Sequence, residues 1–178
     1  MTPCEPAADE PALPAGTYRL TRRDWVKSTG VGVSGAVLAG LAPAATPAAG
    51  AVYPEQRIAD LGALKPDVAV AFTYPDASSP AVLLRLRGPA AGGVGPGQTV
   101  VAFSQLCTHK GCPVSYKPER KLLICPCHWS TFDPAKSGQM VIGQASQPLA
   151  QIKLRIDGNA VFAVGVEGLI FGRHTNML

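Results

Sequence analysis

Two short runs of cysteine and histidine carry the chemistry that this sequence offers. The first reads Cys107-Thr-His-Lys-Gly-Cys112, and the second reads Cys125-Pro-Cys-His-Trp-Ser130. Each run holds a Cys and a His within a few positions, so two short loops could each offer one thiolate and one imidazole to a metal. The segment between them, residues 110–124, is long enough for a hairpin that brings the two loops together.

Four kinds of site use residues of these types. A structural zinc ion would take the same two Cys and two His, but it leaves Cys112 and Cys127 unexplained. A c-type haem requires C-x-x-C-H, and this chain has C-P-C-H, which is one residue short. Disulfides alone would not call for a histidine in each run. The fourth kind is an iron–sulfur centre in which two His replace two Cys on one iron.

The two runs resemble the signature of the Rieske [2Fe–2S] family, C-T-H-x-G-C with C-P-C-H-x-S. This resemblance implies that Cys107, His109, Cys125 and His128 hold one [2Fe–2S] cluster, with both histidines on one iron. With neutral imidazoles the oxidised site carries no net charge, so it accepts an electron more easily than a four-thiolate cluster. Such centres have potentials of roughly −150 to +300 mV. By the same resemblance, the His-ligated iron takes the electron, and reduction can couple to a proton on either histidine.

The other two cysteines of the runs, Cys112 and Cys127, lie just beyond the expected ligands, one in each loop. In an oxidising compartment they can pair and clamp the loops together, and the alternative is two free buried thiols.

Four further positions match residues that surround the cluster in the family. Gly111 permits a tight loop whose N–H groups approach the sulfurs, and Ser130 matches a hydroxyl that donates to a bridging sulfide. Phe132 stands where high-potential respiratory relatives carry a Tyr, so one donor is missing and the potential should be lower. Segment Gly143–Pro148, with Pro148, resembles the loop that covers the cluster from a third side. Plain loop packing is the alternative for Ser130 and Phe132.

Two residues near the second run and the C-terminus need separate comment. Trp129 replaces the small Gly that is common in the respiratory proteins. His174 has no Cys nearby and is expected at the surface or an interface rather than as a ligand.

The segments that flank these loops have the sequence pattern of β-strands. Short β-prone runs separated by turns predict an all-β domain, sandwich or barrel-like. The resemblance to the Rieske family implies that it consists of an antiparallel base domain with an inserted cluster-binding subdomain of two loops. We expect the base at residues 54–102 and 149–178 and the subdomain at 103–148. Gly158-Asn159 predicts a hairpin. The expected strands are Val68–Tyr74, Ala81–Arg87, Thr99–Phe103, Lys121–Ile124, Met140–Ile142, Gln151–Asp157 and Ala160–Val166, with a short last one at Gly168–Gly172.

Residues 1–50 are typical of a targeting signal rather than of a folded domain. Arg22-Arg23 precedes Trp25, and this run resembles the twin-arginine export motif, with an apolar stretch at Val31–Ala42 and small residues beyond it. The apolar stretch is short of the ~20 residues that span a bilayer. Export to the periplasm is therefore expected, with membrane anchoring only through an uncleaved signal. Cys4 precedes the signal and receives no role.

Composition excludes several classes of function. The 178 residues carry a net charge of only +4, with no basic cluster larger than a pair, so a nucleic-acid partner is not expected. Gly 19 and Pro 17 argue against a helical bundle, and 47% hydrophobic residues argue against wholesale disorder.

Within the Rieske class, the chain is most similar to the small subunits of arsenite oxidases. This resemblance implies a large molybdopterin-containing subunit as partner, where arsenite is oxidised. It also implies a soluble cytochrome c or copper protein as the acceptor of the electrons. No catalytic residue of the arsenite chemistry is expected on this chain. The segments that carry the resemblance are Gly111–Tyr116, Cys125–Pro134, Gly138–Val141, Gly143–Ala145, Leu149–Ile152 and Gly168–Leu178.

Three alternatives remain open from the sequence. A Rieske subunit of a quinol–cytochrome c oxidoreductase would need a transmembrane anchor and usually a Tyr at position 132. A ferredoxin of a ring-hydroxylating dioxygenase is cytoplasmic and typically lacks the extra cysteine pair. A zinc-stapled structural module would be colourless and silent in EPR.

Overall fold

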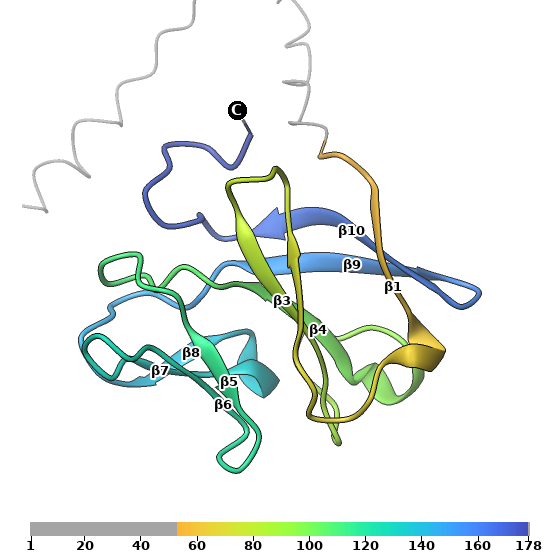
Figure 1. The fold of residues 1–178 in the computed structure, drawn as a ribbon, viewed down its shortest axis with the longest axis horizontal. Coiled ribbons are helices and arrows are strands. Elements are labelled where there is room, and N and C mark those ends of the chain that lie inside the picture. The colour runs from red at the N-terminus through yellow and green to blue at the C-terminus, as the bar shows by residue number, and fades with distance from the viewer. Residues whose placement is uncertain (1–52, 178) are drawn as a thin grey trace, which may run out of the picture. The chain divides into compact units, whose positions relative to one another are not determined.

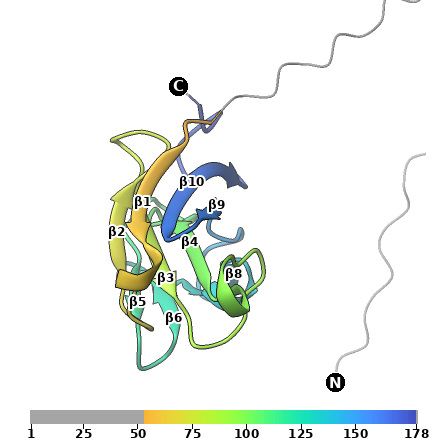
Figure 2. The same ribbon diagram turned by 90° about the vertical axis from the view of Figure 1, so that its right-hand side faces the viewer.

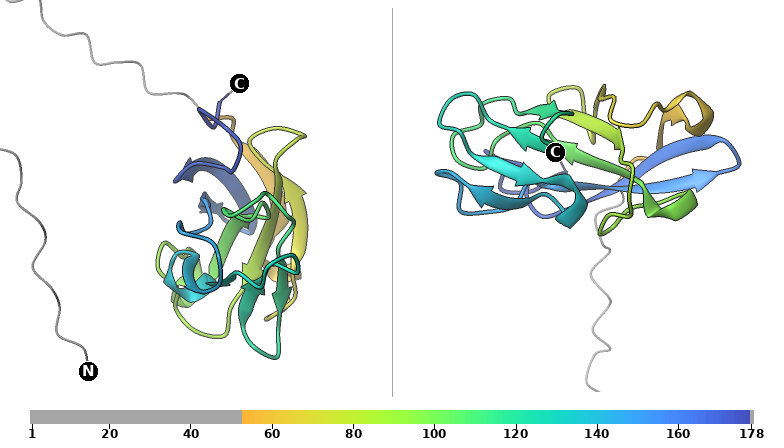
Figure 3. Two further views of the ribbon diagram at one scale, coloured as in Figure 1. Left: turned by 90° about the vertical axis from the view of Figure 1, so that its left-hand side faces the viewer. Right: turned by 90° about the horizontal axis from the view of Figure 1, so that it is seen from below.

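Two antiparallel sheets organise the part of the chain that this computed structural model describes, residues 53–177. The twin-arginine segment and Cys4 lie outside the described residues. Figure 1 shows the elements in chain order, and Figures 2 and 3 show them from other sides. The strands are β1 (Gln56–Asp60), β2 (Val70–Thr73), β3 (Pro80–Arg85), β4 (Val100–Ser104), β5 (Ser115–Lys117), β6 (Leu122–Ile124), β7 (Thr131–Asp133), β8 (Gln139–Ile142), β9 (Gln151–Asp157) and β10 (Ala160–Glu167), with 3₁₀ turns at Leu61–Ala63, Pro96–Gln98 and Pro134–Lys136.

The larger sheet has six strands in the order β1-β10-β9-β4-β3-β2, and the smaller has four in the order β5-β6-β7-β8. All pairings within both sheets are antiparallel. The smaller sheet is inserted between β4 and β9 and lies at the opposite end of the molecule from the β9–β10 hairpin (Figures 1 and 3). The predicted all-β fold with an insertion is confirmed.

Strands β3 and β4 are shared by two cores, which explains why their sequences are apolar at almost every position. On one face, Val82 and Phe103 pack with the smaller sheet. On the other face, Leu83 and Val100 pack with residues of β9 and β10 such as Ile152. Because successive side chains of a strand point to opposite faces, a strand with a core on each side must be apolar throughout.

A polar contact joins the two sheets at one edge. The hydroxyl of Tyr116 on β5 donates to Asp67 Oδ1 at 3.0 Å, and Arg87 Nε donates to Asp67 Oδ2 at 2.5 Å. Burial, reinforced by the Asp67 carboxylate, raises the pKa of Tyr116 to about 12. The smaller sheet is therefore fixed to the larger one by hydrogen bonds as well as by its apolar face.

Seven of the strands expected from the sequence are present, and the Gly158-Asn159 turn joins β9 to β10 as expected. The strand expected at Gly168–Gly172 is wrong. Both glycines have φ +81°, and the Ile170 N–H donates to the Asn176 side chain rather than to a neighbouring strand. The sequence analysis missed β1, β5 and β7, because strands of three to five residues with polar ends give too short a pattern.

Candidate metal centre

The two cysteine–histidine runs fold into the same closed turn. In loop one (Cys107–Cys112), the Cys107 N–H donates to Cys112 O at 2.9 Å, and the Gly111 N–H donates to Cys107 O at 2.8 Å. In loop two (Cys125–Ser130), the Cys125 N–H donates to Ser130 O at 2.9 Å, and the Trp129 N–H donates to Cys125 O at 3.1 Å. Two equivalent turns therefore present their first cysteines in equivalent settings.

Each turn closes on a residue in the left-handed region, as this hydrogen-bond pattern requires. Gly111 has φ +73° and Trp129 has φ +60°. Glycine adopts this conformation without steric cost, whereas a residue with a Cβ is strained there. The glycine of loop one was noted in the sequence for this reason, but the strain at Trp129 could be seen only in the structure.

Two buried thiols lie at the base of the loops. Cys107 and Cys125 are each 1% exposed, and they are the free cysteines of the described residues. Burial, together with the neighbouring Cys125 thiol, raises the pKa of Cys107, while hydrogen bonds from the N–H groups of His109 and Lys110 act in the opposite direction. A metal that binds at this buried position would replace the proton of the Cys107 thiol.

The two imidazoles of the loops contact each other and are more exposed than the thiols. The ring centroids of His109 and His128 are 4.8 Å apart, with the planes at 82°. His128 is exposed and His109 is half-buried. The four side chains thus offer two soft sulfur donors inside and two nitrogen donors outside. This donor set fits a two-iron cluster with one iron on the thiolates and the other on the imidazoles.

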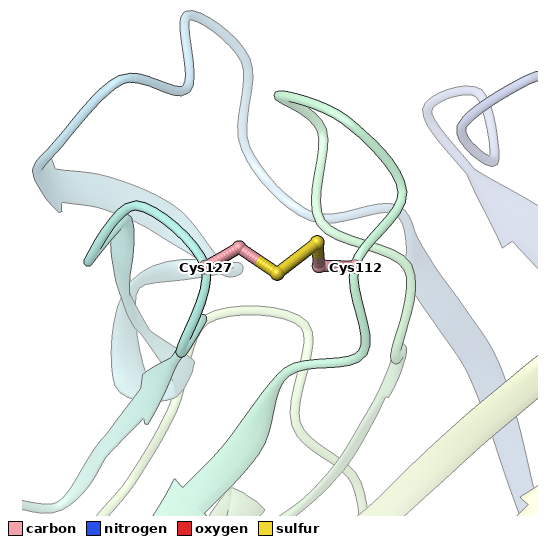
Figure 4. The surroundings of a disulfide bond; sticks show 2 residues. All are labelled: Cys112 and Cys127. Carbon is pink, nitrogen blue, oxygen red and sulfur yellow. A yellow bond between two sulfur atoms is a disulfide. The ribbon is translucent and has the colours of Figure 1, made fainter.

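A disulfide joins the two loops beside this set. Cys112 and Cys127 are bonded, with their Cα atoms 6.5 Å apart (Figure 4). The sulfurs of Cys112, Cys125 and Cys127 lie within 4.8 Å of one another. This group of three is not a metal site, because the two bonded sulfurs have no thiolate to offer. The expected pairing of Cys112 with Cys127 is present, and it places a covalent link next to Cys125.

Ser130 connects loop two to the third loop, Gly143–Pro148. The side chain is fully buried, and its Oγ accepts the N–H groups of Gln144 at 3.1 Å and Ala145 at 3.0 Å. A Cβ at Gly143 would lie 2.4 Å from Ser130 Cα, so the close approach of these backbones requires glycine. The Ser130 hydroxyl hydrogen has no acceptor among the hydrogen bonds of the described residues, so it is available to donate to a bound group, and a cluster sulfur as its acceptor stays a prediction.

The third loop is also tied to loop one. Thr108 Oγ donates to Gln147 O at 2.7 Å, next to the exposed Pro148. The third loop therefore contacts both cysteine–histidine loops, and its expected role as a cover of the cluster stays a prediction. No sequence signal marked Thr108, because its partner lies 39 positions away.

Phe132 and His174 occupy contrasting environments. Phe132 on β7 is fully buried, in the same cluster of side chains as Cys107 and Cys125. His174 is exposed, in the segment that follows β10. The structure thus pairs Cys107 with Cys125 and His109 with His128 across the two loops, whereas the role of these four residues as ligands stays a prediction.

Comparisons with known proteins agree with this site. The model of the Rieske [2Fe-2S] domain family matches residues 60–153. Iodate reductase subunit IdrB of Denitromonas iodatirespirans is 40% identical over 171 residues, which cover 94% of this chain and 92% of that protein. The cytochrome bc1 complex Rieske iron-sulfur subunit of Streptomyces lividans is 41% identical over 59 residues, which cover 33% of this chain and 35% of that protein.

A solved structure shows the same fold. The soluble domain of Rieske protein II from Sulfolobus acidocaldarius superposes with a TM-score of 0.59 at 24% identity, over 68% of this chain and 82% of that one. Together with the family match, the donor set identifies the group held at this site as a Rieske [2Fe–2S] cluster.

Proposed function

This chain belongs to the Rieske [2Fe–2S] family, and we propose that it is the electron-transfer subunit of a molybdopterin-containing oxidoreductase that acts on a small inorganic oxyanion. The observation that carries the proposal is the similarity to an iodate reductase subunit, which runs through nearly the whole of both chains. A similarity of this extent reaches well beyond the two cysteine–histidine loops.

The side chains around the centre have separate tasks in electron transfer. When bound, a Rieske cluster supplies a one-electron carrier with a potential of roughly −150 to +300 mV. Cys107 and Cys125, each 1% exposed, would hold it from the buried side, where water is excluded. His128 is exposed, so it offers a partner protein a short path for electrons to and from the cluster. The N–H groups of His109 and Lys110 stabilise negative charge on the Cys107 sulfur.

Arsenite is the first candidate substrate, because the segments quoted above resemble arsenite oxidase small subunits. In that case electrons pass from the large subunit to this chain and on to a soluble cytochrome c or copper protein. Iodate is the second candidate, favoured by the similarity to IdrB. For an iodate reductase the electrons would run in the opposite direction, from the carrier through this chain to the large subunit.

One experiment separates the two candidates with the cluster itself as the readout. The chain, tagged and purified from its own cells with the subunit that accompanies it, is examined by EPR without oxygen. Arsenite added to the oxidised complex should produce the signal of the reduced Rieske cluster. Loss of the signal on adding iodate to the reduced complex would favour the second candidate instead. A complex without molybdenum, or one that responds to neither anion, would overturn the proposal.

A Rieske subunit of a quinol–cytochrome c oxidoreductase is the remaining alternative. Among the described residues, no helix has the length and apolar character needed to cross a membrane. Phe132 stands where such subunits usually carry Tyr, and the similarity to a bc1 subunit is confined to a third of this chain. Reduction of the cluster by a quinol, with no response to arsenite or iodate, would favour this alternative.

We also propose that the chain works in the periplasm after twin-arginine export. Two observations support this location: the Arg22-Arg23 run of the sequence and the Cys112–Cys127 disulfide, which persists in an oxidising compartment. Replacing both arginines with Lys should leave the protein in the cytoplasmic fraction, and comparison with a variant that changes only Lys27→Arg controls for charge. Normal export of the double variant would contradict this location.

A further inference from the structure

The segment that follows β10, Gly168–Met177, lies against loop one. A Cβ at Gly111 would be only 2.8 Å from the ring carbons Cδ1 and Cε1 of Phe171. The ring thus covers the backbone of loop one at its left-handed residue, between His109 and Cys112. Figure 1 shows this segment, in dark blue, beside the green loop that follows β4. Gly111 is therefore required both by its φ of +73° and by the ring above it.

This segment is folded back on itself by one buried side chain. Ile170, which precedes Phe171, is fully buried, and its N–H donates to Asn176 Oδ1 at 2.9 Å. Asn176 Nδ2 in turn donates to Gly168 O at 2.8 Å. Asn176 is 7% exposed, so these bonds are sheltered from water. The position of Phe171 is thus fixed by hydrogen bonds on both sides of it.

A bidentate ion pair attaches the same segment to the β2–β3 turn. Arg173 Nη1 donates to Asp76 Oδ2 at 2.7 Å and Nη2 donates to Asp76 Oδ1 at 3.0 Å, with a third bond from Nη2 to Ser78 Oγ at 3.0 Å. The Arg173 side chain is 12% exposed and that of Asp76 is 27% exposed. Two parallel hydrogen bonds in partial shelter make a strong and directional contact.

The strand that leaves this turn also holds the other side of loop one. The N–H of Gln105, two residues before Cys107, donates to the carbonyl of Pro80 at the start of β3 at 2.8 Å. The β2–β3 hairpin therefore supports loop one and the residues just before it at two points. One contact is direct, before Cys107, and the other passes through Arg173 and Phe171 to Gly111.

We propose that Gly168–Met177 is a brace for loop one, with Phe171 and Arg173 as positioning residues that set the potential and the lifetime of the cluster. The brace holds the closed turn that surrounds the Cys107 side chain, in which the Cys107 N–H donates to Cys112 O and the Gly111 N–H donates to Cys107 O. In this turn, backbone N–H groups can donate to the Cys107 sulfur. Because hydrogen bonds to sulfur favour the reduced state, a relaxed turn lowers the potential. This inference rests on loop one holding the cluster and is independent of the large subunit and its substrate.

The first test replaces Phe171 by Ala and uses Phe162→Ala as the matched control. Phe162 is also half-buried, but it lies on β10 of the larger sheet, beneath Arg155. Phe171→Ala should lower the midpoint potential in an EPR-monitored titration and speed cluster loss at a fixed temperature by about tenfold. Phe162→Ala should lower the melting temperature of the sheet, measured by circular dichroism, and leave the potential unchanged.

The second test is a double-mutant cycle. Gly111→Ala forces a Cβ into the Phe171 ring and also strains the backbone, so it should speed cluster loss strongly. Adding Phe171→Ala removes the collision but not the strain. The double variant should therefore lose its cluster more slowly than the product of the two single effects. Purely multiplicative effects would show that the ring does not press on loop one.

If the Phe171→Ala protein does not accumulate in cells, Arg173→Gln provides a second test, because this variant leaves the apolar packing of Phe171 in place. It should shift the potential in the same direction by a smaller amount, with Arg173→Lys in between because Lys cannot form the bidentate pair. Unchanged potential, EPR spectrum and cluster lifetime in both Phe171→Ala and Arg173→Gln would overturn the brace. Absence of a Rieske EPR signal in the wild type would instead refute the ligand assignment.

Discussion

Loops one and two share a backbone solution but differ in what supports it. The same pair of hydrogen bonds closes each turn, and each turn ends on a left-handed residue. Loop one is covered at that residue by Phe171, whereas the corresponding residue of loop two, Trp129, is 70% exposed. Loop two is instead held from the buried side, by the N–H groups that donate to Ser130 Oγ.

This difference explains why the two positions tolerate different residues. At Gly111 both the backbone conformation and the covering ring exclude a side chain. At Trp129 only the conformation disfavours one, at a cost of about 1–2 kcal/mol, because solvent leaves room for the ring. Both loops therefore adopt the same turn, and the surroundings of its left-handed position determine which residue that position can accommodate.

Removing any one of the four predicted ligands should have the largest effect, and an equal one in both loops. Replacing Cys107, His109, Cys125 or His128 with Ala should abolish the cluster, because one iron would lose half of its protein ligands. Absorbance and EPR of the purified variants measure this. His174→Ala is the matched control: the residue lies in the brace segment, but its side chain is exposed and the segment is fixed by Arg173 and Asn176 instead, so the variant should retain a normal spectrum. A normal Rieske signal in any of the four variants would refute the ligand set.

Cutting the covalent link between the loops should have the next largest effect. The disulfide closes a loop with a sequence separation of 15, which contributes about 3 kcal/mol in the chain-entropy model. The Cys112→Ser, Cys127→Ser double variant should still assemble the cluster but lose it at a lower temperature. Cluster absorbance during heating, for the variant and for the wild type, checks this. Identical curves would mean that the loops are held by their hydrogen bonds alone.

The chemistry of the two loops could be predicted from the sequence because its signals are local. The cysteine and histidine positions, the glycine of the first turn and the disulfide pair all lie within two short runs, and the resemblance to a family gave them their roles. The alternating strand Gln151–Asp157 was likewise predicted with its observed bounds, since a period of two over seven residues is a strong pattern.

The supports of the loops could not be predicted, because they join residues far apart in the chain. Phe171 lies against Gly111. Arg173 pairs with Asp76, which lies 97 positions earlier in the chain. Nothing in the apolar run at Gly168–Gly172 distinguishes a strand from a segment whose Ile170 N–H is taken by a side chain. The error at this segment and the omission of the brace therefore have the same origin.

Acid should weaken the support of loop one and leave that of loop two unchanged. Hydrogen bonds from Arg173 hold the pKa of Asp76 well below its ordinary value of 3.8. A lowered pKa gives stability that is present above pH 3.8 and lost as the pH falls below it. Wild type should exceed Asp76→Asn in stability by about 1–2 kcal/mol at pH 7. The difference should narrow as the pH falls below 3.8 and close only below the lowered pKa that Asp76 has in the folded protein.

A matched control sharpens this test, because Asp60 forms an ion pair with Arg57 that is largely exposed. Asp60→Asn should change stability little at any pH. A constant gap between wild type and Asp76→Asn from pH 7 to pH 3 would contradict the assigned ion pair.

Ser130→Ala should lower the midpoint potential while the cluster stays in place. Loss of a hydrogen bond of about 1 kcal/mol to a cluster sulfur corresponds to about 40 mV for one electron. The cluster should also be lost sooner on heating, because the N–H groups of Gln144 and Ala145 lose their acceptor. Ser104→Ala is the control, since that buried hydroxyl accepts an N–H from Leu106 on the base side.

Phe132→Tyr should change the potential in the opposite direction, by supplying the donor that this chain lacks. The side chain is fully buried beside the thiols, so the new hydroxyl needs a sulfur or another acceptor there. Redox titration of both variants is the measurement. If neither the loss of the Ser130 hydroxyl nor the added hydroxyl of Phe132→Tyr changed the midpoint potential, these side chains would not contact the sulfurs of the cluster.

Relieving the strain of loop two should have the smallest effect, and it should be a gain. Trp129→Gly places the residue that suits φ +60° at the end of the turn, which should stabilise the isolated subunit by about 1 kcal/mol or less, since glycine also loses more entropy on folding. Trp129→Ala removes the same ring but keeps the strained backbone, so it separates the two contributions. Cluster loss on heating should be slowest for the Gly variant, with the Ala variant close to wild type. Faster loss in both variants would mean that the exposed ring shields the centre, and that loop two, like loop one, depends on an aromatic cover.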